Sequence, residues 1–133
     1  MILKKEVTKI DKKCLFEKYQ KSSEFWDVEI ESVNQHGLSG DTILHFAVWQ
    51  EDIEDIKKLI LLGADINSIG DLGNTPSHQA VLFEKAESIK ILLSHGANTA
   101  IKNEFGEKAG DIATRNGMKS IITTNEKIQK YHI

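Results

Sequence analysis

The sequence predicts an all-α solenoid of about three and a half to four stacked helix–turn–helix pairs, joined by turn or hairpin tips. Two observations predict this fold class. The window 40–72 recurs as the window 73–105 after 33 residues, without a gap and with twelve identical positions. Each window also holds two apolar stretches with helical spacing, separated and followed by turn residues. Neither pair of helices can bury its own apolar face, so neighbouring pairs have to stack.

The window 73–105 carries clear helix-start and helix-end signals. Thr75 can cap the first helix, and Pro76 falls in its first turn, where the missing N–H costs nothing. Gly96 follows the second helix as a helix-ending glycine. The apolar positions of this second helix are spaced three and four apart and predict a buried stripe of Ile89, Leu92 and Leu93.

These signals form motifs that resemble those of the ankyrin-repeat family. Its repeat start, T-P-L-H-x-A, stands here as TILHFA at 42–47 and TPSHQA at 75–80. Its repeat end, a Leu-Leu pair before Gly-Ala, stands as LILLGAD at 59–65 and LLSHGAN at 92–98. A degenerate third copy, GEKAGDIATRNGMKSII, follows at 106–122, and the resemblance extends over about residues 15–122. The resemblance implies an ankyrin solenoid that binds other proteins.

The repeats divide a single predicted domain, 1–133, into four parts. These are a degenerate N-terminal cap repeat at 7–39, repeats at 40–72 and 73–105, and a C-terminal cap repeat with tail at 106–133. We expect residues 11–31 to form a first helix pair and residues 125–133 to extend the last helix. The apolar cover of this first pair would come from Leu15, Phe16, Tyr19, Phe25 and Trp26.

Charge and composition narrow the class of protein. Net charge is +4 over residues 1–22, −8 over 23–65 and +1 over 66–133. The acidic middle would repel nucleic acid and attract a basic protein, although charge runs are usually a solvated face.

Cys14 is the single cysteine, which excludes an intrachain disulfide and fits a reducing compartment. With neither a signal-peptide pattern nor an apolar stretch long enough to cross a membrane, the sequence predicts a cytoplasmic protein without membrane contact.

Candidate chemistry is sparse. His45 and His78 could bind a metal, but they occupy the same place in successive repeats. The resemblance implies that this histidine braces the turns. Cys14 aligns with the packing positions Ala47 and Ala80, which favours a buried, inert thiol over a nucleophile. Without a phosphate-binding loop or a paired acid and base, we expect no enzyme, metal or cofactor.

The resemblance implies that partners meet the tips and the exposed side of each first helix. The predicted contacts on the tips are His36, Leu38, Asp41, Ile69, Asp71, Leu72, Asn74, Lys102, Glu104 and Phe105. Those on the first helices are Trp49, Gln50, Leu82, Phe83 and Arg115. Aromatic and Arg side chains are typical of binding hot spots.

Two neighbouring features complete this surface. Trp49 and Phe83 could instead pack between helices, since Glu51 and Glu84 stand where the family has glycine and would let the first helix run on. An acidic set just beyond, suited to a basic target, comprises Glu51, Asp52, Glu54 and Asp55.

The function expected from these features is non-enzymatic protein binding. A small acidic repeat protein of this kind resembles bacterial immunity proteins, which neutralise a cognate and often basic toxin. We expect a monomer that forms a heterodimer with such a partner through its concave face and tips, without direct contact to nucleic acid. The alternative is an ankyrin adaptor or secreted effector that grips a host or signalling protein.

Overall fold

The computed structural model describes residues 4–123, and its regular elements are helical. They are α1 (Lys4–Gln20), α2 (Ile43–Gln50), α3 (Ile53–Leu61), the short 3-10 turn η1 (Asp71–Gly73), α4 (Pro76–Leu82), α5 (Ala86–Ser94) and α6 (Ala109–Arg115). Residues 119–123 are helical as well. Within 4–123 the only strand-type pairing is an isolated antiparallel bridge between Lys102 and Lys108. The predicted all-α class is confirmed.

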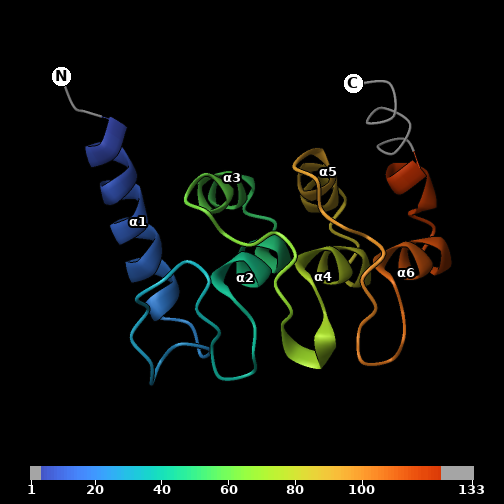
Figure 1. The fold of residues 1–133 in the computed structure, drawn as a ribbon, viewed down its shortest axis with the longest axis horizontal. Helices are drawn as coiled ribbons and strands as arrows, with labels where there is room; N and C mark the ends of the chain where they lie inside the picture. Colours follow the sequence, from blue (N-terminus) through green and yellow to red (C-terminus); the bar gives the residue numbers. More distant parts are fainter. Residues whose placement is uncertain (1–3, 124–133) are drawn as a thin grey trace.

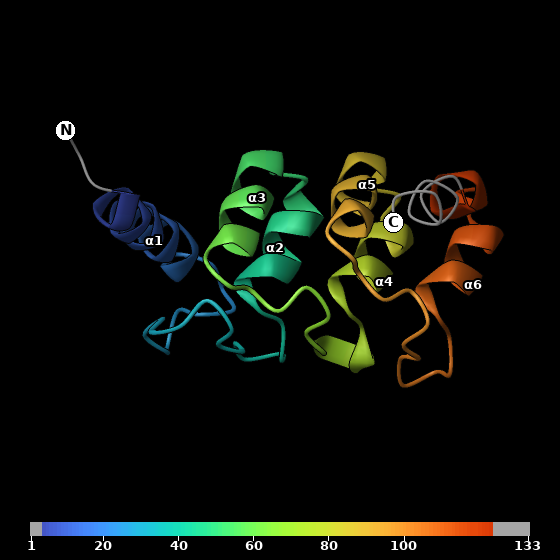
Figure 2. The same cartoon turned by 45° about the horizontal axis from the view of Figure 1, so that its top comes forward.

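The helices form two rows with the tips on one side (Figure 1). An inner row consists of α2, α4 and α6, which pack in that order. An outer row places α3 on α2 and α5 on α4, and α3 also packs on α5. The loops between repeats project from the inner row on the side away from α3 and α5, and Figure 2 shows the successive helix pairs side by side. This is the stacked solenoid that the 33-residue period predicts.

A continuous apolar core joins the repeats. Its members run from Leu15 in α1 to Ile122 near the end of the described chain. The predicted stripe residues Ile89 and Leu92 are fully buried, and Leu93 is nearly so. Small side chains at Ala47 and Ala80, also fully buried, let neighbouring inner helices approach closely.

The tips repeat one hydrogen bond at 33-residue intervals. A backbone N–H at the start of each tip donates to the carbonyl four residues later, at 2.8, 2.8 and 2.9 Å. The three pairs are Gly37 with Asp41, Gly70 with Asn74, and Asn103 with Glu107. The period therefore continues upstream of residue 40, where no inner helix precedes the tip.

Gly70 is required by a close approach rather than by its backbone angles. An added Cβ would lie 2.3 Å from Asp41 Oδ1 and 2.7 Å from His45 Nε2. Because the His45 ring is fully buried and hydrogen-bonded, it cannot retreat. We expect Gly70→Ala to lower the free energy of unfolding by about 2 kcal/mol, measured by urea denaturation.

Gly110 in α6 is the matched control for this substitution. A Cβ there would meet nothing within 4 Å. Gly110→Ala should therefore raise the stability by about 0.5–1 kcal/mol, since alanine favours the helix. Equal effects of the two substitutions would contradict the packing of the Gly70 tip.

The expected helix pair at 11–31 is wrong, because α1 is followed by turns and not by a second helix. Hydrogen bonds from the Gln20 side chain, and not helical backbone hydrogen bonds, hold this segment. Gln20 Nε2 donates to the carbonyls of Phe25 (2.6 Å) and Val28 (2.8 Å). Its Oε1 accepts from the Ile30 N–H at 2.8 Å. Phe25 is fully buried as expected, but Trp26 is 69% exposed and does not cover the core. The expected helix at 125–133 lies outside the described residues.

The expectation that the first helices run on past Glu51 and Glu84 is also wrong. Both residues adopt a left-handed φ of 54° and end the helix as a glycine would. After each of them the chain folds back, with Asp52 N–H donating to the Ala47 carbonyl at 3.0 Å in the first case. In the third copy Gly117 occupies this place, with a φ of 76°. A glutamate therefore accepts the strain that a glycine would avoid.

Candidate functional site

Backbone and side-chain hydrogen bonds join the predicted tips into one row. Asp41 Oδ1 accepts from the Asp71 N–H at 2.9 Å, which links the first tip to the second. The Leu72 carbonyl accepts from the Glu104 N–H at 3.0 Å, which links the second tip to the third. Since each tip is tied to its neighbour, the row presents its side chains on a fixed frame.

Two bands of exposed apolar side chains lie on this frame. The tip band consists of Leu38, Ile69, Leu72 and Phe105, all exposed. The helix-end band consists of Trp49, Leu82 and Phe83, all exposed as well. The inner helices begin just after the tips, so the two bands are separated by an inner helix of seven or eight residues, about 10–12 Å. Trp49 is 47% exposed and Phe83 51%, so packing between helices leaves half of each side chain open.

Several polar members of the predicted set already have partners within the chain. The Asn74 side chain accepts from Asn103 Nδ2 at 3.0 Å. Arg115 pairs with the Glu107 carboxylate. His36 Nδ1 lies within hydrogen-bond distance of the Gly40 carbonyl. Asp41, which links the first two tips, is half-buried, and the other four polar members are exposed, namely Gln50, Asp71, Lys102 and Glu104.

The two repeat histidines brace the tips, in agreement with the structural role predicted for them. His45 Nδ1 accepts from the Thr42 N–H at 3.0 Å, and His45 Nε2 lies 2.9 Å from the Asn74 carbonyl. His78 makes the same two contacts one repeat later, with Thr75 at 3.1 Å and with Glu107 at 2.8 Å. Because a backbone N–H can only donate, each ring is neutral, with its proton on Nε2. Each ring thus ties a helix start to the following tip.

Burial lowers the pKa of His45 below its usual value, even though the Asn74 carbonyl favours the protonated ring. A positive ring would also turn Nδ1 into a donor facing the Thr42 N–H. Within residues 4–123, no group of three or more His, Cys, Asp or Glu side chains is arranged to hold a metal ion.

Three of the four carboxylates expected to meet a basic target have ion-pair partners within the chain, and Glu54 has the weakest, with Lys57 Nζ at 3.8 Å. Lys18 Nζ lies 2.7 Å from Asp52 Oδ2 and 2.6 Å from Asp55 Oδ2. Tyr19 OH donates to the same Asp55 oxygen at 2.8 Å, and Asp52 Oδ1 caps α3 by accepting from the Asp55 N–H. The lysine contacts hold the pKa of Asp52 below its usual value and raise that of Lys18. Asp52 and Asp55 thus fasten α1 to α3, and their charge is already engaged within the chain.

The prediction of a buried thiol at Cys14 is wrong, because Cys14 is exposed. Leu15 and Tyr19, one helical turn apart, take the buried stripe of α1 instead. The alignment with Ala47 and Ala80 failed here because α1 has no second helix to pack against in its own repeat.

The comparison with known families agrees with this architecture. The family model described as "Ankyrin repeats (3 copies)" matches residues 44–124, more than half of the chain. No curated protein matches the chain. Within the described residues, no helix combines the length and apolar character needed to cross a membrane. The chain belongs to the ankyrin-repeat family, whose repeats are typically non-enzymatic protein–protein interaction modules.

Proposed function

We propose that this protein is an inhibitor of the immunity type, which binds and neutralises a basic toxin or effector in the cytoplasm. The binding face would comprise the tip band and the helix-end band. The observation that supports it is the exposure of seven apolar side chains on the tips and inner helices, including Trp49, Phe83 and Phe105. Large aromatic side chains held on a rigid frame are typical anchors of protein interfaces.

Charge around the binding face favours a basic partner. Asp71 and Glu104 are exposed beside Leu72 and Phe105 of the tip band. Glu84 is exposed beside Phe83 of the helix-end band. Complementary charge at the rim of an interface speeds association and selects the partner more than it adds affinity.

The experiment that tests this function is a pull-down with the tagged full chain from its source organism, with bound proteins identified by mass spectrometry. The proposal expects a single partner in stoichiometric amount, basic, toxic when expressed alone and harmless when co-expressed with this protein. Several substoichiometric partners, none of them toxic, would contradict the inhibitor and favour an adaptor or secreted effector.

The binding face gives a separate prediction about affinity. Trp49→Ala combined with Asp71→Lys should raise the dissociation constant of the complex at least about 30-fold, since it removes an anchor and reverses a rim charge. Leu61→Ala is the matched control, because Leu61 is 86% exposed but lies on the outer helix α3. Calorimetric titration of the captured partner measures both. If Leu61→Ala weakened binding and the double substitution did not, the interface would lie on the outer row of helices.

A further inference from the structure

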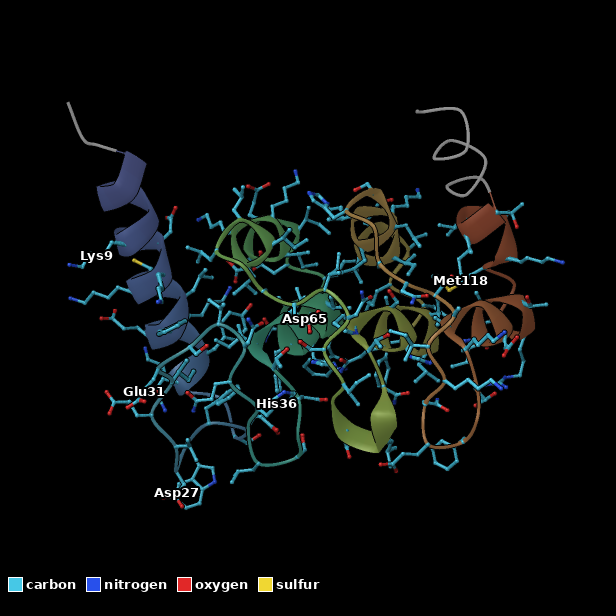
Figure 3. The ribbon with its side chains drawn as sticks, in the orientation of Figure 1. Lys9, Asp27, Glu31, His36, Asp65 and Met118 are labelled. Carbon is cyan, nitrogen blue, oxygen red and sulfur yellow. The ribbon has the colours of Figure 1, made fainter. Side chains whose placement is uncertain are left out.

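A second apolar surface lies at the α1 end of the solenoid. A groove of about 930 Å³ opens between α1 and residues 26–30. Its lining on α1 includes Lys9, Phe16 and Gln20. Lys18 reaches α3, and Lys9 falls nine residues earlier on the helix, which places the groove on the opposite side of α1. Figure 3 shows Lys9 projecting away from the stack.

The groove is preformed and apolar. Trp26 is 69% exposed, and Val28 beside it is also exposed. Phe16 on the opposite wall is partly buried, with Lys12 Nζ 5.6 Å from its ring centroid. The Gln20 side chain donates to the carbonyls of Phe25 and Val28, so the facing segment is held at a fixed position on α1. An exposed tryptophan in a fixed groove is typical of a surface that another molecule covers.

Charge along the groove is separated into two ends. Toward the start of α1 the lining residues are basic, namely Lys9, Lys12 and Lys13. Toward the end of α1 they are acidic, namely Glu17, Asp27 and Glu29. In Figure 3, Lys9 lies on α1 above Asp27, which is at the lower edge of the molecule.

We propose that this groove binds a second copy of the chain in an antiparallel, two-fold arrangement. Equal numbers of basic and acidic lining residues disfavour a strongly charged partner of either sign. Separation of the two signs makes the groove complementary to itself when it is turned by 180°, because each basic end then meets an acidic end. The same rotation places Trp26, which precedes Asp27 in the chain, inside the interface at the acidic end of each groove. A homodimer thus replaces the monomer that the sequence suggested, and it leaves the tips and inner helices open.

The first test is sedimentation equilibrium of the full chain over a range of concentrations. A reversible dimer is expected, and Trp26→Ser should raise its dissociation constant at least about tenfold. Trp49→Ser, which changes the binding face instead, should leave the dimer unchanged. A monomer at the highest concentration the protein allows, or a dimer equally sensitive to both substitutions, would overturn the proposal. Neither result bears on capture of a toxin, so the two proposals fail separately.

A charge swap tests the two-fold geometry. The variant Lys12→Glu, Lys13→Glu and the variant Asp27→Lys, Glu29→Lys should each be monomeric, because like charges then meet at both ends of the interface. Mixed in equal amounts, they should form a heterodimer, because each end then pairs opposite charges. Circular dichroism of each variant checks that it folds. Folded variants that fail to associate when mixed, or that dimerise alone, would overturn the antiparallel arrangement.

Discussion

Replacing Phe25 with alanine is expected to lower the free energy of unfolding by about 4 kcal/mol, the largest effect of any single substitution considered. The Phe25 side chain is fully buried, and its ring meets that of Phe46 edge-on at 6.4 Å between centroids. Its loss would leave a cavity between the turns after α1 and the inner helix α2. Urea denaturation followed by circular dichroism measures the change.

The neighbouring Trp26 supplies the control for Phe25. It is larger but 69% exposed, so Trp26→Ala should change the stability by no more than about 0.5 kcal/mol. The comparison is made at a protein concentration low enough to keep both chains monomeric. If Trp26→Ala lowered the free energy of unfolding more than Phe25→Ala, then Trp26 and not Phe25 would be the buried side chain of the segment after α1.

The second largest effect is expected at the histidine braces. His45→Ala should lower the free energy of unfolding by about 3 kcal/mol, because it opens a cavity and leaves the Thr42 N–H and the Asn74 carbonyl without these partners. His78→Ala should match it, since the ring contacts are equivalent. His95 is exposed, and His95→Ala serves as the control, expected within about 0.5 kcal/mol of wild type. A wild-type-like His45→Ala variant would show that the ring does not brace the tip.

The His45 brace should also depend on pH. Burial lowers the pKa of the folded ring, so the unfolded chain binds this proton more readily. The stabilisation is therefore complete above the unfolded pKa of about 6.5 and is lost as the pH falls through the folded pKa. The stability difference between wild type and His45→Ala should shrink between pH 7.5 and 5. A constant difference would contradict a neutral, buried ring.

The sequence predicted most of the fold wherever a residue had a counterpart 33 positions away. His45 and His78, or the stripes ending at Gly63 and Gly96, repeat because stacking imposes the same packing on each copy. The positions of the tips were predicted for the same reason, since the same 33-residue period sets the exposed positions between helices.

The N-terminal part could not be predicted in this way. The alignment places Trp26 opposite Leu59, which is fully buried, yet Trp26 lies in a turn segment organised by the Gln20 side chain. Likewise, Lys18 pairs with both Asp52 and Asp55 from more than 30 residues away. Pairings of this kind depend on tertiary placement and leave no local pattern. For the binding face, the sequence predicts which positions are exposed but not the partner, because exposure makes binding possible without specifying what binds.

Hydrogen exchange of the captured complex would test the central claim, that partners bind the tips and inner helices, most directly. We predict slowed exchange at residues 36–41, 69–74 and 102–107 and at the ends of α2 and α4 when the partner is bound. Exchange at α3 and α5 should not change. Protection confined to the outer helices α3 and α5 would contradict the claim.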